Sequence, residues 1–265
     1  MNLIEQKPDD KFKTKGRDRL ESMMAIYVKN KHEIQAIYKR GQLKRFFTKE
    51  KSYIHRWDFY EKRENIGYQC SNPWVYNIIR NELIENKSNI IYNPEAKRHQ
   101  GYRQNRGLVK NLEIGDLIYQ TDMVKCYPQI AKRLNYIGHE AYIKLAKKYN
   151  KAKTDICIAF TTAFSEEYVV SYKDGKIIEK IDTTHYELEH ALGNICWEVY
   201  GHVDHLYKKY PEIILGFVVD AVYSLQLEPV REYFDLMGIE VKTITFEWWG
   251  DGVLFSPEAG IKKMF

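Results

Sequence analysis

Residues 117–136 read LIYQTDMVKCYPQIAKRLNY, and this stretch sets a single acid, Asp122, between a strand and a helix. The residues before the acid are apolar, β-branched or aromatic, which favours a half-buried strand. After Pro128 the apolar residues recur at intervals of three to four, which predicts one face of a helix. A carboxylate at such a junction suits a metal ion, although an ordinary turn aspartate occupies the same kind of position.

A second isolated acid, Asp220, interrupts the apolar run IILGFVVDAVYSLQL of residues 213–227, which we interpret as one buried strand. An ionised carboxylate in such a run costs free energy unless it is paired or binds a metal. The two acids are therefore better explained together than apart. Two carboxylates on neighbouring strands can hold a pair of divalent ions about 3.5–4 Å apart, the arrangement that serves phosphoryl transfer.

The two motifs resemble those of family B DNA polymerases, particularly the viral and protein-primed branch. The segment DMVKCYP of residues 122–128 resembles motif A, in which an aspartate is followed five residues later by Tyr-Pro. The segment FVVDAVY of residues 217–223 is similar to motif C, with Asp220 matching the second acid of the Asp-Thr-Asp pattern and Val218 replacing the first. The resemblance covers about residues 110–265 and implies a polymerase palm, an antiparallel sheet backed by helices.

This resemblance also implies roles for individual residues. Asp122 and Asp220 would bind two Mg²⁺ (or Mn²⁺) ions that activate a primer 3′-hydroxyl and hold the incoming triphosphate. The backbone N–H groups at the helix entry would bind the triphosphate, and Tyr127 would exclude a 2′-hydroxyl, unless it is a core aromatic residue fixed by Pro128. The nucleotide-binding candidates are Met123, Val124, Lys125, Cys126 and Tyr127, and the candidates for contact with the primer-template duplex are Lys262 and Lys263.

The chain also departs from the family. Family B enzymes place a fingers helix with a Lys-rich, Asn-Ser-x-Tyr-Gly motif between motifs A and C, and we find no such motif between Asp122 and Asp220. We expect no thumb-sized segment after Asp220 and no proofreading exonuclease domain before motif A. The chain is then either a minimal polymerase or a palm that has kept its fold and lost synthesis.

A basic segment, YNPEAKRHQGYRQNRG of residues 92–107, precedes motif A. It contains Arg98, Arg103 and Arg106, and arginine suits bidentate contact with phosphate. Its aromatic residues suit stacking on bases. The alternative is a solvated basic loop without a ligand.

The remaining patterns predict an α+β chain in three parts. Residues 1–16 are expected to be a mobile basic tail. Residues 17–110 are expected to form a mainly helical N-terminal region, because apolar residues recur at helical spacing over 17–47 and Asn72-Pro73 starts a further helix. Residues 111–265 are expected to form the palm-like domain. Its predicted elements are a helix over 141–148, strands over 156–164, 168–172 and 177–181, and a helix over 185–207.

Composition restricts the function only broadly. The chain has 265 residues, is 44% hydrophobic and has a formal charge of +5, which is compatible with a nucleic-acid partner. The four cysteines have no paired spacing, so neither a disulfide framework nor a zinc ribbon is predicted, and the histidines of residues 185–205 have no metal-ligand spacing. No apolar run is long enough to span a bilayer, so we expect no membrane.

We therefore expect a small template-directed nucleotidyltransferase that acts on primer-template DNA with deoxynucleoside triphosphates. It would work in the cytoplasm, encoded by a virus or mobile element, with other replication subunits as possible partners. A reverse transcriptase relation is a variant of this hypothesis, although Ala221 rather than a second aspartate follows Asp220. The alternatives are a non-catalytic nucleic-acid-binding accessory protein on a degenerate palm and a two-metal nuclease.

Overall fold

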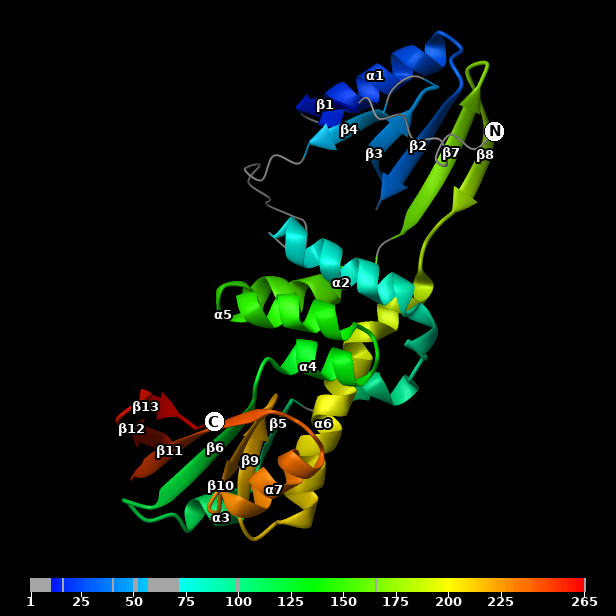
Figure 1. Ribbon diagram of the computed structural model, residues 1–265. Helices are drawn as coiled ribbons and strands as arrows, with labels where there is room; N and C mark the ends of the chain where they lie inside the picture. The colour runs from blue at the N-terminus through cyan, green and yellow to red at the C-terminus, as the bar shows by residue number, and fades with distance from the viewer. Residues whose placement is uncertain are drawn as a thin grey trace. The chain divides into compact units, whose positions relative to one another are not determined.

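The computed structural model describes residues 11–15, 17–39, 41–49, 52–56, 72–98, 101–164 and 166–264. The chain forms two compact units, one from residues 1–71 with 161–188 and the other from residues 72–160 with 189–265. Each unit contains one sheet (Figure 1). Each is thus built from two separate stretches of chain, whereas the sequence predicts three consecutive parts with boundaries near residues 16 and 110. The tail predicted over residues 1–16 lies mostly outside the described residues.

The described residues of the first unit form a six-stranded sheet, against which helix α1 (Arg17–Lys29) packs. Its strands, in sheet order, are β1 (Lys11–Lys15), β4 (Ser52–Arg56), β3 (Gln42–Phe47), β2 (Ile34–Lys39), β7 (Glu167–Lys173) and β8 (Lys176–Asp182). Leu20 of α1 packs with Ala36 and Phe46 of the sheet in a buried cluster. The prediction of a helix pair over residues 17–47 is therefore right for its first half and wrong for its second. Gly41, with a φ of +69°, lies in the turn of the β2–β3 hairpin found there.

The predicted hairpin over residues 168–181 is confirmed, but in a different sheet from the one expected. Asp174 and Gly175 both have positive φ, as a two-residue type I′ turn requires. The strands on either side, β7 and β8, pair with each other, and β7 pairs with β2 in the first unit. This hairpin therefore does not belong to the sheet that contains Asp122.

The second unit contains a seven-stranded antiparallel sheet. Its strands, in sheet order, are β13 (Gly260–Lys263), β12 (Val253–Ser256), β11 (Val241–Gly250), β6 (Leu117–Met123), β10 (Ala221–Ser224), β9 (Ile214–Val218) and β5 (Tyr102–Gln104). A flat sheet would place β13 about 14 Å from β6. Instead, Lys262 Nζ of β13 donates to Gln120 Oε1 of β6 at 2.8 Å, so the sheet curls strongly. The predicted α+β class, with an antiparallel sheet backed by helices, is confirmed.

The helices of the second unit are α2 (Pro73–Glu85), α3 (Arg106–Lys110), α4 (Cys126–Arg133), α5 (His139–Thr162), α6 (Ala191–Lys209) and α7 (Glu228–Leu236), with 3₁₀ turns η1 (Lys87–Asn89) and η2 (Pro94–Arg98). Asn72 caps α2 as predicted, because its side chain accepts from two backbone N–H groups of the first turn. The helix predicted over 185–207 is present as η3 (Tyr186–His190) followed by α6. The strand predicted over 156–164 is wrong, because α5 continues to Thr162. Among the described residues, no helix has both the length and the apolar character needed to cross a membrane.

The two faces of the seven-stranded sheet differ. Phe217 of β9 lies edge-on to Tyr200 and Tyr207 of α6, which defines the face that α6 covers. The opposite face contains a buried cluster that includes Ile118 and Tyr223, against which the short α3 segment also packs. Because side chains alternate along a strand, each residue of the sheet can be assigned to one of these faces.

Candidate active site

Asp122 lies near the end of β6 on the sheet face opposite α6. In the strand register it stands between Ala221 of β10 and Lys242 of β11. Ala221 belongs to the buried cluster on that face. Because directly paired residues of an antiparallel sheet point to the same side, the side chain of Asp122 lies on that face too. Helix α4 begins four residues later at Cys126, as the sequence predicts. The side chain of Asp122 keeps 20% of its surface exposed, so the carboxylate is accessible to a ligand.

Asp220 lies in the turn of a hairpin and not within a strand. The apolar run of residues 213–227, predicted as one strand, folds into β9 and β10 with Val219 and Asp220 between them. Val219 has a φ of +54°, a conformation that is unusual for a β-branched residue. No glycine or asparagine marks this turn in the sequence, which explains why the prediction is wrong here.

The turn sets the second acid beside the first. Met123 N donates to the backbone oxygen of Asp220 at 3.3 Å, directly next to Asp122 in the chain. Burial raises the pKa of the Asp220 carboxyl, and the nearby charge of Asp122 raises it further. A hydrogen bond from the Cys126 thiol and the charge of Lys153 act in the opposite direction without cancelling the rise in this pKa. The structure thus brings together the two acids that the sequence singles out.

Two lysines that the sequence analysis did not select flank this acid pair. Lys242 Nζ forms an ion pair with Asp122 Oδ2 at 3.1 Å, and its side chain is 60% exposed. Lys153 of α5 acts on the pKa of Asp220 and is exposed. Neither lysine lies near its acid in sequence, so only the β6–β11 register and the path of α5 reveal these neighbours. Carboxylate oxygens are ligands suited to Mg²⁺, but no group of three or more His, Cys, Asp or Glu side chains converges within the described part of the chain.

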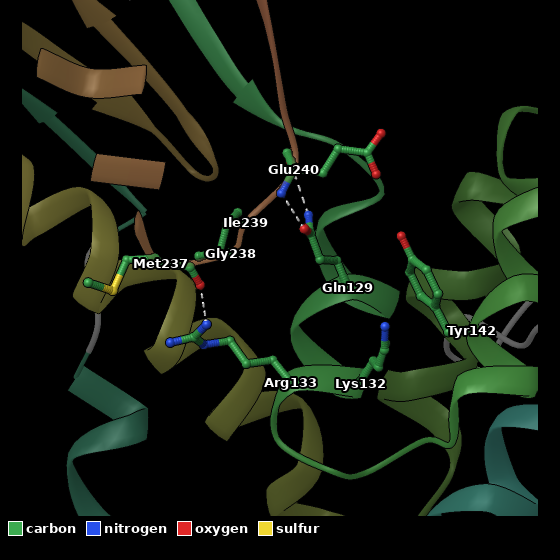
Figure 2. Close-up of a pocket in the computed structure, with 8 residues that line it drawn as sticks. All are labelled: Gln129, Lys132, Arg133, Tyr142, Met237, Gly238, Ile239 and Glu240. Atoms are coloured by element: carbon green, nitrogen blue, oxygen red, sulfur yellow. Dashed lines mark hydrogen bonds between the residues drawn. The ribbon is translucent and has the colours of Figure 1, made fainter. Parts of the chain in front are cut away.

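An open pocket of about 500 Å³ lies in the second unit (Figure 2). Its lining residues come from α4, the start of α5 and the segment between α7 and β11: Gln129, Lys132, Arg133, Tyr142, Met237, Gly238, Ile239 and Glu240. Glu240 is two residues before Lys242, and its backbone oxygen accepts from Val124 N at 2.8 Å. The pocket therefore adjoins the end of the strand that contains Asp122.

Gln129 holds the wall of this pocket together. Its amide nitrogen donates to the backbone oxygen of Val124. The same nitrogen donates to the Glu240 backbone oxygen, and the amide oxygen accepts from the Glu240 N–H (Figure 2). Lys132 lies over the Tyr142 ring, 5.1 Å from its centroid. Arg133 donates to the Met237 backbone oxygen and contacts Glu198 at 3.4 Å. The pocket thus combines a lysine, a partly engaged arginine and the side chain of Glu240.

The predicted nucleotide-binding backbone is only partly available. The N–H groups of Met123 and Val124 already donate to the backbone oxygens of Asp220 and Glu240. Lys125 has a left-handed backbone, and no side chain caps α4 there. Burial raises the pKa of the Cys126 thiol, and so does the neighbouring Asp220. These contacts hold the acid pair in position. The N–H groups of Met123 and Val124 are therefore already used and are not open to a triphosphate.

Tyr127 is engaged inside the protein. Burial raises the pKa of its hydroxyl, and Cys196 and Cys157 lie close enough to raise it further. A hydrogen bond from Tyr127 lowers the pKa of the Cys196 thiol, which burial otherwise raises. This environment agrees with the core-aromatic alternative for Tyr127, locked next to the buried Pro128.

The basic segment reaches the acid pair through its backbone. Val219 N donates to the Gly101 oxygen at 2.6 Å, and Tyr102 stands opposite Val218 in the sheet. Arg103, however, points to the α6 face, where it pairs with Asp204 at 2.9 Å and lies over the Tyr207 ring. That arginine is therefore occupied by structural contacts.

The other predicted phosphate contacts have different surroundings. Arg106 starts α3 and is exposed, with no ion pair among the described residues. Arg98 ends η2, and its side chain lies outside the described part, as do residues 99–100. Lys262 is bound to Gln120 on the face of Asp122, whereas Lys263 is exposed on the other side of β13.

Scans against protein-family models, curated proteins and solved structures each find no match to this chain.

Proposed function

We propose that the second unit is a template-directed nucleotidyltransferase that uses Asp122 and Asp220 to bind Mg²⁺ or Mn²⁺. The observation that supports this most strongly is the pairing of the two acids, with the pKa of Asp220 raised by burial and by Asp122. Two adjacent carboxylates that are partly removed from water repel each other, and a divalent cation relieves that repulsion. The Lys242 ammonium offsets part of this repulsion at Asp122, and the pKa of Asp220 nevertheless stays raised.

The bound ions would supply Lewis-acid activation of a primer 3′-hydroxyl and neutralise the charge of a triphosphate. The chain's own residues have complementary roles in this proposal. Asp122 and Asp220 orient the ions, and Gln129 fixes the backbone on which Asp122 and Lys242 stand. Lys153 lies on α5, which follows Asp122 and precedes Asp220 in the chain, and it adds positive charge for an anionic substrate. In family B enzymes the fingers motif supplies that charge, and we find no such motif in this sequence. Lys132 in the adjacent pocket adds another.

Primer extension tests this proposal. We expect the protein to extend a labelled primer on a DNA template with four deoxynucleotides and Mn²⁺ or Mg²⁺. Asp122→Asn and Asp220→Asn should each abolish extension, and Asp251→Asn, a change at an exposed turn aspartate, should not. Extension that survives both site variants would refute the assignment of the two acids.

The second candidate, a non-catalytic nucleic-acid-binding accessory protein, is favoured by one observation. Lys242 already pairs with Asp122, so one carboxylate has a partner without any metal ion. This function predicts primer-template binding without extension by folded protein. A two-metal nuclease would instead shorten the primer, and a reverse transcriptase would copy an RNA template. The viral or mobile-element origin, the cytoplasmic location and further replication subunits belong to the proposal as well.

A further inference from the structure

Helix α5 presents a row of four lysines on one exposed side. Lys144, Lys147, Lys148 and Lys151 are spaced i, i+3, i+4 and i+7, which places them on a single face of the helix. All four side chains are exposed. We call these residues the lysine stripe. It extends over about 10 Å at 1.5 Å per residue.

The stripe is poorly compensated within the protein. Lys144 pairs with Glu140 at 3.9 Å, and among the described residues Lys147 and Lys151 form no ion pair. Lys148 lies over the ring of Trp74 in α2, 4.2 Å from its centroid, and Trp74 is 38% exposed. Like charges at i, i+4 destabilise a helix by about 0.2–0.5 kcal/mol per pair. The stripe contains two such pairs, so it lowers the stability of the helix. A helix face that only contacts solvent can avoid this cost by alternating positive and negative residues.

The stripe leads toward the acid pair. Ala152 has non-helical dihedral angles, with a φ of −133°, and kinks α5 directly after Lys151. The next residue, Lys153, is also exposed. Positive charge therefore continues along α5 from Lys144 past the kink to Lys153, which is near enough to Asp220 for its charge to act on that carboxylate.

We propose that the lysine stripe binds the phosphates of a single nucleic-acid strand on its way to the acid pair. Binding of a strand by the stripe does not require catalysis. The further statement that this strand leads to the acid pair rests on the proposed function. A strand with its bases stacked carries one phosphate per 3.4 Å of helix axis, so up to about three phosphates fall within 10 Å. Trp74 adds an aromatic surface of the kind that stacks on bases.

The structure argues against a membrane as the occupant. Helices that lie on membranes expose apolar residues beside their lysines. Most large apolar residues of α5 are instead used inside the protein, since Leu145, Ile156 and Phe160 are at most 1% exposed, and the 38% exposed Ile143 does not by itself form an apolar face beside the lysines. An acidic protein segment is the remaining occupant, and the experiment below separates it from nucleic acid.

The test is fluorescence anisotropy with a labelled 20-nucleotide oligothymidylate in EDTA, titrated at several salt concentrations. The double variant Lys147→Gln/Lys151→Gln removes two like-charge neighbours, so it should fold at least as well as wild type by thermal unfolding. We expect the slope of log K against log salt to fall by about 1.4, since each phosphate contact contributes about 0.7. The same relation gives roughly 25-fold weaker binding at 0.1 M salt.

The matched control is Lys173→Gln/Lys176→Gln, which removes the same charge from the exposed β7–β8 turn of the other unit. It should bind like wild type. Equal losses in both double variants, or none in the stripe variant, would overturn the proposal. Displacement of the oligonucleotide by polyglutamate at equal charge would assign the stripe to an acidic protein and overturn it too. Because EDTA removes divalent ions, this comparison stands even if wild type extends no primer.

Discussion

Replacing Lys242 should tighten the binding of divalent ions at the acid pair. In the structure the Lys242 ammonium neutralises Asp122 at 3.1 Å, so an ion that binds this carboxylate must first displace the lysine. The Lys242 side chain is 60% exposed, and an ion pair this exposed is worth about 0.2–1 kcal/mol. At RT of about 0.59 kcal/mol, displacing it weakens the apparent affinity by about 1.4- to 5-fold. Lys242→Met should recover that factor.

The assay is titration with Mn²⁺ followed by the electron paramagnetic resonance signal of the free ion. Wild type, Lys242→Met and Lys263→Met are compared, the last as an exposed lysine of the same sheet that contacts neither acid. We expect a lower dissociation constant for Lys242→Met alone, with at most about 1 kcal/mol lost from the free energy of unfolding. An unchanged or higher dissociation constant for Lys242→Met would refute displacement of the lysine by the ion.

Three further outcomes are expected. Val219→Gly should raise the free energy of unfolding by about 0.5–1 kcal/mol in urea, because it relieves about 1–2 kcal/mol of left-handed backbone strain at some entropic cost; a loss of stability would contradict this. Asp220→Asn should match wild type in stability near pH 3 and exceed it increasingly above about pH 4, since the folded state raises the pKa of Asp220 and the charged form is therefore disfavoured; urea unfolding between pH 3 and 7 measures this, and equal stability throughout would count against it. Tyr127→Phe should cost about 0.5–1.5 kcal/mol through its lost hydrogen bond to Cys196 and leave any preference for deoxynucleotides unchanged in single-nucleotide incorporation; a changed preference would restore Tyr127 to the sugar site.

The junction around Asp122 could be predicted from sequence because its signals are local. The residues of β6 have strand propensity, and the apolar spacing after Pro128 matches a helix. The Asp-Gly turn between β7 and β8 is equally local. The sequence does not indicate which sheet a hairpin joins, because that depends on pairing between strands far apart in the chain, such as β7 with β2.

Three errors have physical causes. The β9–β10 turn has Val219 in a conformation that favours glycine, so its residues give no turn signal. The β-branched and aromatic content at the end of α5 predicts a strand, although Ile156, Ala159, Phe160 and Ala163 are buried at helical spacing. The β2–β3 hairpin has apolar residues that also fit a helix, and short apolar runs do not separate the two.

In the candidate site, too, local sequence indicates some residues, and only the folded structure brings the others near. The sequence indicates Asp122 and Asp220 because a lone acid in an apolar run is costly, and the structure sets them side by side. The sequence does not indicate Lys242 or Lys153, because each lies far from its acid in the chain: Lys242 meets Asp122 through the β6–β11 register, and Lys153 lies in α5. Arg103 was selected by residue type, and its partner Asp204 is 101 positions away in the chain.

The most direct test of the two-acid site is anomalous diffraction from crystals grown with Mn²⁺. The account predicts an anomalous peak within coordination distance, about 2.0–2.6 Å, of carboxylate oxygens from both Asp122 and Asp220, with Lys242 turned away from Asp122. A crystal that contains Mn²⁺ elsewhere, with none between these carboxylates and the Lys242–Asp122 pair intact, would contradict the account.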